Sequence, residues 1–201
     1  MSQLLNLWGG EKELITTMSA FHIPSILLAI PRNPVTAVGL PLVAGFLSSG
    51  PVTTKVANSN WYYGLSTPPG NPPREVFPIV WTLLYCGMGY ASHVAVKALD
   101  TSVTSKSQNK LTIGIALYYA QLGLNLAWTP LFFGAHKTGL ALVDSAALTL
   151  TTCYMTKLFD RPTNGKATWF LLPYCGWLAY ATYLNAGVWW LNGPAKKPKN
   201  H

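Results

Sequence analysis

The chain has 201 residues, of which 50% are hydrophobic and only 10% are charged, and its formal net charge is +8. Soluble domains usually carry about 25% charged residues, so this composition argues against an ordinary soluble fold and favours a membrane protein. The positive charge forms no basic stripe and accompanies no RNA-binding motif, which argues against a nucleic-acid partner.

The amino-terminal segment 1–33 is predicted to be an extension that precedes the membrane domain. Its apolar stretch, 14–30, is short and contains His22 and Pro24. A position at the membrane interface and a poorly ordered state are both consistent with this pattern. A targeting segment is a further alternative, although the stretch lacks the Arg-rich amphipathic character of a matrix presequence.

Five later segments meet the length of roughly 20 apolar residues that a helix needs to cross a bilayer. These predicted spans are 35–54, 76–98, 111–133, 139–159 and 168–191. They predict an all-α membrane protein in which residues 34–192 form a five-transmembrane-helix bundle. The tail that follows, 193–201, is basic and suits a position near anionic lipid headgroups.

The connections between the spans differ in length. The first, 55–75, is rich in Pro, Gly and Asn and contains Trp61 and Tyr62, which predicts an ordered lid over one end of the bundle, with a flexible spacer as the alternative. The polar segment 99–110 is predicted to be a loop. An Asn-Gly pair indicates a turn within 160–167. Basic residues divide eight to six between the two sides of this topology, so the positive-inside rule does not decide the orientation.

Polar side chains inside the spans should face the bundle interior or a cavity, because lipid cannot satisfy their hydrogen bonds. Gln121 and Asn125 lie four residues apart and share one helix face with Trp128. Asp144 lies inside the fourth span and Asn185 inside the fifth. Hydrogen bonding between helices and the lining of a pocket both explain these groups.

Aromatic side chains recur on one face of two spans. Trp81 and Tyr85 share a face of the second span, and Trp177 shares a face of the fifth span with Ala181 and Leu184. A small residue such as Ala181 beside large aromatic residues either admits another helix or leaves room for a ligand. Aromatic walls with a few polar groups are typical of sites for flat apolar ligands.

Small residues and cysteines are the remaining side chains of interest in the second, fourth and fifth spans. Gly87 and Ala91 form a small-xxx-small pair that predicts close helix packing, with dimerisation as an alternative use. Cys86, Cys153 and Cys175 lie in apolar runs without metal-ligand spacing, so they are interpreted as reduced thiols, and no metal site is predicted. The sequence also contains no conventional catalytic set.

Five blocks of the sequence resemble the translocator protein family, also called tryptophan-rich sensory proteins, TspO/MBR proteins or peripheral-type benzodiazepine receptors. The blocks are W-Y-Y-G-L-x-x-P at 61–68, P-P-R-E-V-F-P-I-V-W-T-L-L-Y-C-G-M-G-Y-A-S at 72–92, Q-L-G-L-N-L-A-W-T-P-L-F-F-G at 121–134, A-L-V-D at 141–144, and P-Y-x-x-W-L-A-Y-A-T-Y-L-N at 173–185. Their order and spacing cover about three quarters of the chain.

This resemblance implies five membrane helices around a pocket that the first loop closes. It implies binding of porphyrins such as protoporphyrin IX or haem, of sterols and of synthetic benzodiazepine-type ligands, with no required cofactor. The family's pocket positions correspond here to Trp61, Trp81, Tyr85, Asn125, Trp128, Trp177, Ala181 and Leu184. The resemblance further implies a homodimer in the mitochondrial outer membrane, with secretory-pathway membranes as the alternative.

Two features depart from the pattern of the animal members of the family. The sterol motif near the end of the fifth span needs a Tyr and then a basic residue, and these positions hold Ala186 and Trp190. A frequent pocket tryptophan is replaced by Leu140. The predicted function is therefore a membrane receptor or transporter for porphyrins, sterols or related flat ligands. The alternatives are Trp81- and Trp177-dependent porphyrin degradation, and a structural or regulatory membrane partner.

Overall fold

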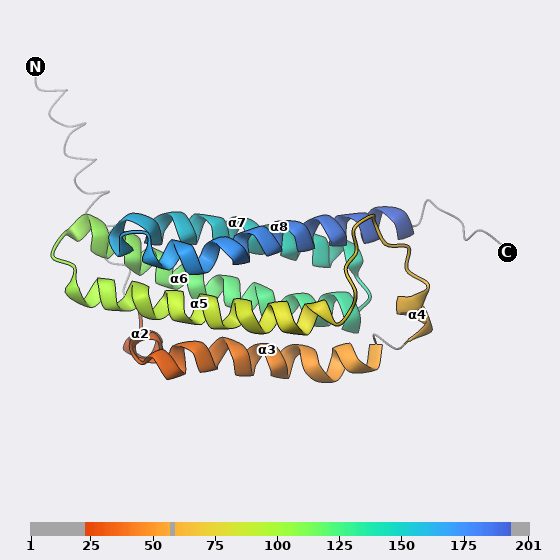
Figure 1. Cartoon of the computed structure of the whole chain (residues 1–201), viewed down its shortest axis with the longest axis horizontal. Coiled ribbons are helices and arrows are strands. Elements are labelled where there is room, and N and C mark those ends of the chain that lie inside the picture. Colours follow the sequence, from red (N-terminus) through yellow and green to blue (C-terminus); the bar gives the residue numbers. More distant parts are fainter. Residues whose placement is uncertain (1–22, 57–58, 194–201) are drawn as a thin grey trace, which may run out of the picture.

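The computed structural model describes residues 23–56 and 59–193, and five long helices contain most of them. The long helices, which run side by side in Figure 1, are α3 (Pro34–Val56), α5 (Val76–Thr101), α6 (Ser105–Thr129), α7 (Thr138–Asp160) and α8 (Lys166–Asn192). The shorter elements are α2 (Ser25–Arg32), α4 (Asn60–Tyr63), the π-helical turn η1 (Pro130–Gly134) and the 3₁₀ turn η2 (Arg161–Thr163). Within the described residues the fold is all-helical, as predicted. The predictions for residues 1–22 and 194–201 fall outside this part of the chain.

The five long helices form a closed ring of neighbours. Helix α3 contacts α5 and α6, α5 contacts α8, α8 contacts α7, and α7 contacts α6. In Figure 1, α3 lies along one side of the bundle and α7 and α8 lie along the opposite side. Residues that are distant in sequence, on α5, α6 and α8, therefore face the same interior.

Each long helix coincides with one predicted span, but the helix ends differ from the prediction. The segment 99–110, predicted as a loop, is mostly helical, because α5 continues to Thr101 and α6 begins at Ser105. Hydropathy shows only which part of a helix is apolar. Lys and Gln are good helix formers, so a helix can continue beyond its apolar part. The amide of Gln108 donates to the Ser102 carbonyl at 2.7 Å across the short connection. The predicted turn after α7 is present, with Asn164 and Gly165 at φ values of 52° and 76°.

The outside of the bundle is apolar and the inside contains polar groups. Phe46, Ile79, Val143 and Leu150 expose 74%, 65%, 66% and 72% of their surface, and they lie on three different helices. Buried polar side chains include Ser92, Gln121, Asn125, Thr152 and Asn185. Large exposed apolar surfaces require a partner or a lipid environment, so this distribution fits a bundle surrounded by acyl chains.

When both length and hydropathy are required, fewer helices qualify as membrane spans than the five that the sequence predicts. One described helix, Val76–Thr101, is long and apolar enough to cross a membrane. A second candidate is the pair Ser25–Arg32 and Pro34–Gly50, which bends by 104° at its break. Helix α7 contains many Thr residues and α8 contains many Trp and Tyr residues, which lower their mean hydropathy. The helical bundle is confirmed, whereas the count of five membrane crossings stays a prediction.

Helix α2 lies against the end of the bundle that contains the α5–α6 connection (Figure 1). The guanidinium of Arg32 binds the carboxylate of Asp100 through two contacts, at 2.9 and 3.0 Å. The hydroxyl of Tyr119 donates to the Leu27 carbonyl at 2.7 Å. These contacts attach the last part of the predicted extension to α5 and α6.

Candidate functional site

A chain of hydrogen bonds crosses the interior and joins three helices. The Tyr85 hydroxyl on α5 donates to Asn125 Oδ1 on α6 at 2.7 Å, and Asn125 Nδ2 donates to the Tyr174 hydroxyl on α8 at 3.1 Å. The Tyr174 hydroxyl then donates to Gln121 Oε1 at 2.8 Å. Tyr174 and Gln121 are fully buried. Since each polar atom in this series of hydrogen bonds has a partner, the network holds α5, α6 and α8 in one relative register.

Aromatic rings surround this network. The centroid of Trp81 lies 5.6 Å from that of Tyr85 and 6.3 Å from that of Tyr174. Trp177 packs edge-on against Phe77 at 5.8 Å, and its indole Nε1 is buried without a hydrogen-bond partner among the described residues. Buried indole N–H groups usually find an acceptor, so this unpartnered donor is an exception that needs an explanation.

Two of the predicted pocket tryptophans belong to a different cluster. Trp128 donates from Nε1 to Asn185 Oδ1 at 2.9 Å and stacks on Phe132 at a centroid distance of 4.9 Å. Trp61 on α4 stacks on His136 at 3.9 Å and meets Phe132 edge-on at 6.0 Å. These residues pack near the α6–α7 hairpin, apart from the core around Trp81. The structure thus divides the predicted single set into two groups.

The small residues of α5 pack within the chain. Ala91 is fully buried, and a Cβ added at Gly87 would lie 3.1 Å from the Phe170 carbonyl oxygen on α8. Gly87 thus packs closely against α8, as the helix-packing interpretation expects, and the use of this face in dimerisation stays a prediction. On α8 itself, Leu184 is buried and Ala181 is half-buried, on the side of Trp177 that leads toward the first loop.

Asp144 on α7 differs from the other polar residues of the spans. Its Oδ2 atom is buried and has no hydrogen-bond partner within the described residues. The neighbouring Ser145 hydroxyl instead bonds the Thr182 hydroxyl on α8 at 2.7 Å. Asn185 has two partners, because its Nδ2 also donates to the Thr138 carbonyl at 2.9 Å. Hydrogen bonding between α7 and α8 therefore comes from hydroxyl and amide groups rather than from Asp144 Oδ2.

The segment 64–75 runs along the end of the bundle beside α8 (Figure 1). The side chain of Asn192 bonds both backbone groups of Ser66, accepting from the amide at 2.9 Å and donating to the carbonyl at 2.8 Å. The Tyr180 hydroxyl donates to the Gly70 carbonyl at 2.5 Å. Backbone and side-chain contacts thus hold the loop on α8, and its action as a lid stays a prediction.

Gly187 on α8 allows the closest approach of this loop. A Cβ added there would lie 2.5 Å from Pro68 Cγ and 2.6 Å from Pro68 Cβ. We expect Gly187→Ala to displace the loop, with amide hydrogen exchange at Leu65, Ser66 and Thr67 accelerated about tenfold, since overpacking costs about 1–3 kcal/mol.

The matched control for this change is Gly176→Ala on the same helix, where an added Cβ meets nothing within 4 Å. Its exchange pattern in the loop should equal that of the parent protein. Equal exchange in both variants would contradict the close contact between Pro68 and α8.

The comparisons with known proteins agree with this geometry. The model of the TspO/MBR family matches residues 37–191, a range that includes both clusters, the polar network and the first loop. The chain belongs to the TspO/MBR family.

Relatives of this TspO/MBR protein occur in fungi, animals and bacteria. The translocator protein homolog of Schizosaccharomyces pombe is 44% identical over 131 residues, which cover 65% of this chain and 77% of the relative. The translocator protein of Bos taurus is 38% identical over 158 residues, covering 77% and 89% of the two chains. The tryptophan-rich protein TspO of Chlorobaculum tepidum is 37% identical over 156 residues, covering 77% and 92%. Membership of this family makes the chain a membrane protein with a receptor- or transporter-like role.

The sequence reasoning missed Tyr174 in this TspO/MBR protein. Tyr174 contacts both Trp81 and Asn125, and it joins the aromatic rings to the polar network. A signal was present, because Tyr174 lies three residues before Trp177 and therefore shares its helix face. His136 was also missed, and no spacing in the sequence indicates that it stacks on Trp61.

Proposed function

We propose that this TspO/MBR protein binds a flat apolar ligand, a porphyrin or a sterol, between α5, α6 and α8. The observation that carries the proposal is the buried Nε1 of Trp177, which has no hydrogen-bond partner among the described residues and belongs to the same apolar cluster as Trp81 and Tyr174. A ligand with an acceptor at its edge would satisfy that donor while its face stacks on the indoles. Each such aromatic contact contributes about 0.5–1.5 kcal/mol beyond area burial.

The polar network supplies orientation in this proposal. Asn125 accepts from Tyr85 and donates to Tyr174, so it offers both a donor and an acceptor to a ligand that displaces either tyrosine. These side chains contact one another directly, so entry of a ligand requires them or the loop 64–75 to move. The loop acts as the lid in this proposal, and its hydrogen bonds to Asn192 and Tyr180 are the contacts that must open.

The proposal includes five membrane crossings and an organelle. The long helices contain 23 to 27 residues, which corresponds to about 35–40 Å at 1.5 Å per residue, enough for a hydrocarbon core of about 30 Å. Following the family resemblance, we place the protein in the mitochondrial outer membrane as a homodimer. The dimer contact would use an exposed apolar face, because Gly87 packs against α8 and Ala91 is fully buried. Fractionation and crosslinking test these two points.

Titration with protoporphyrin IX tests the binding site. We expect the full chain in detergent to bind protoporphyrin IX saturably. The shift of the porphyrin absorption band measures this binding. Replacing Trp81 and Trp177 together by Phe should weaken this binding about tenfold, because two stacking contacts are reduced and the unpartnered indole donor is removed.

The control is a double Trp→Phe change at Trp189 and Trp190, which expose 45% and 72% of their surface near the end of α8. This pair removes the same number of indoles at the expected membrane interface and should leave the affinity unchanged. Equal affinity in all three proteins would exclude the proposed site. Illumination of the same samples separates binding from Trp-dependent degradation, since a bound porphyrin that is not degraded keeps its absorbance.

A further inference from the structure

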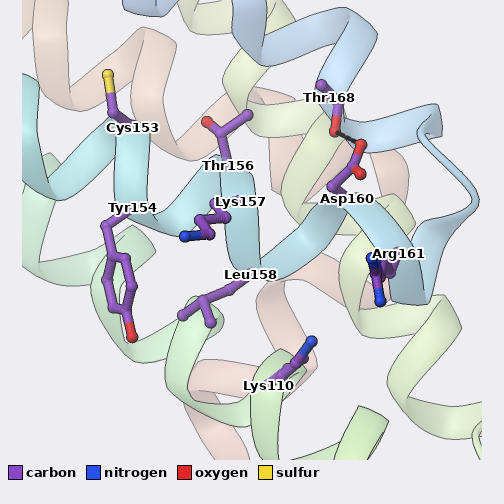
Figure 2. A pocket seen from close by; sticks show the side chains of 9 residues that line it. All are labelled: Lys110, Cys153, Tyr154, Thr156, Lys157, Leu158, Asp160, Arg161 and Thr168. Atoms are coloured by element: carbon purple, nitrogen blue, oxygen red, sulfur yellow. Dashed lines mark hydrogen bonds between the residues drawn. The ribbon is translucent and has the colours of Figure 1, made fainter.

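A surface hollow of about 620 Å³ lies between α6 and α7, at the end of the bundle opposite the loop 64–75. It is separate from the rings of Trp81 and Trp177. Figure 2 shows the side chains that line it: Lys110 from α6, residues from the last two turns of α7, Arg161 from η2 and Thr168 from α8. The hollow combines basic groups with an apolar wall.

The three basic side chains of the hollow have no acidic partner in the part of the chain that the structure describes. Lys110, Lys157 and Arg161 form no ion pair with a described residue. The only carboxylate in the lining, that of Asp160, accepts a hydrogen bond from the Thr168 hydroxyl at 2.7 Å, and Figure 2 shows this carboxylate turned toward α8. The hollow therefore presents an excess of positive charge, which suits an anionic group.

An apolar surface continues from this charge along α7. Leu158 lines the hollow, Tyr154 lies one turn closer to the middle of the helix and exposes 54% of its surface, and Leu150 lies a further turn away and exposes 72%. Residues at this spacing of four share one helix face. Basic groups at the helix end above an exposed apolar face match the two parts of a phospholipid. A free anion would use only the basic part.

The net charge of this whole end of the bundle also favours an anionic lipid. Among the described residues it contains seven basic residues and two acidic ones, Asp100 and Asp160. Anionic lipid headgroups attract basic residues that lie near the membrane surface.

We propose that the hollow between α6 and α7 binds one anionic glycerophospholipid. The phosphate lies between Lys110, Lys157 and Arg161, and an acyl chain lies on Tyr154 and Leu150 of α7. This site is independent of the proposed ligand site inside the bundle, so either can fail without the other.

Native mass spectrometry of the full chain in a neutral detergent tests this proposal. Titration with dioleoyl phosphatidylserine should give one tightly bound lipid, whereas dioleoyl phosphatidylcholine should bind about tenfold more weakly. Inorganic phosphate and glycerophosphoserine, added at the same concentrations, should not displace the bound lipid. Equal binding of the two lipids, or displacement by either soluble phosphate compound, would overturn the proposal.

The matched variants each remove three positive charges. Lys110→Gln, Lys157→Gln and Arg161→Gln together should weaken the binding of phosphatidylserine by about tenfold or more, since each basic residue near an anionic surface contributes a factor of about five. The control combines Lys97→Gln, Lys106→Gln and Lys166→Gln, which are exposed at the same end but outside this hollow. Its affinity should stay within about twofold of the parent value. An equal loss in both triple variants would show general attraction and overturn the site.

A single change keeps the test decisive if the triple variant does not fold. Lys157 is exposed and forms no ion pair with a described residue, so Lys157→Gln leaves the helix packing intact. It should weaken phosphatidylserine binding about fivefold. Full affinity in this variant would contradict the placement of the phosphate.

Discussion

Replacing Gly89 by Ala should strongly destabilise the bundle, even though alanine is the better helix former. A Cβ added at Gly89 would lie 2.5 Å from the Ala37 carbonyl oxygen and 2.7 Å from Val38 Cα. Both contacts are with the backbone of α3, which cannot move aside as a flexible side chain can. Overpacking of this kind costs about 1–3 kcal/mol and occasionally more. Thermal unfolding in detergent, followed by circular dichroism, measures the loss.

The matched control is Gly123→Ala on α6, where an added Cβ meets nothing within 4 Å. In a helix, Gly is less favourable than Ala by roughly 0.5–1 kcal/mol, so this variant should be as stable as the parent or more stable. The two substitutions are chemically identical, but only Gly89→Ala should lower the unfolding temperature. An unfolding temperature of Gly89→Ala at or above that of the parent would contradict the close crossing of α3 and α5.

Replacing Asn125 by Leu should remove the centre of the polar network. The substitution leaves the Tyr85 hydroxyl without its acceptor and the Tyr174 hydroxyl without its amide donor. A buried polar group that loses its partner costs about 1–3 kcal/mol. We expect a lower free energy of unfolding in detergent and weaker protoporphyrin binding, because the group proposed to orient the ligand is lost.

A double-mutant cycle separates the hydrogen bond from other effects. Tyr85→Phe removes only the donor, so the combined Asn125→Leu and Tyr85→Phe variant should lose less stability than the sum of the single changes. The coupling should be about 0.6–1.7 kcal/mol, the range for hydrogen bonds between membrane helices. Asn185→Leu combined with Tyr85→Phe is the control, since Asn185 bonds Trp128 and Thr138 instead. That pair should be additive within about 0.5 kcal/mol, and equal coupling in the two cycles would contradict the assigned partners.

Much of the fold could be predicted because hydropathy and periodicity are local properties. The five apolar runs predicted five long helices, and each run coincides with one of them. The spacing of Gln121 and Asn125 predicted a shared face, and both side chains are buried inside the bundle. The Asn-Gly pair predicted the turn at Asn164 and Gly165. The helix ends near Thr101 and Ser105 were not predicted, because backbone hydrogen bonds continue through polar residues.

The candidate site could be predicted only in part, because helical spacing shows which residues share a face but not which helix that face meets. Trp61 and Trp128 were grouped with Trp81, and the structure places them in a separate cluster at the α6–α7 hairpin. The spacing of Gly87 did not show which helix it packs against, and the structure places α8 there.

By itself, then, the amino-acid sequence determined the class of the protein, the positions of its helices and the residues that avoid lipid, since these depend on the order of apolar and polar side chains along the chain. Only the tertiary structure decided that Tyr174 joins Asn125 to Trp81, that Trp177 Nε1 has no partner among the described residues, and that Lys110 lies beside Arg161 in one hollow. These relations depend on the rotation and neighbours of each helix, which are set by packing between residues that are distant in the chain.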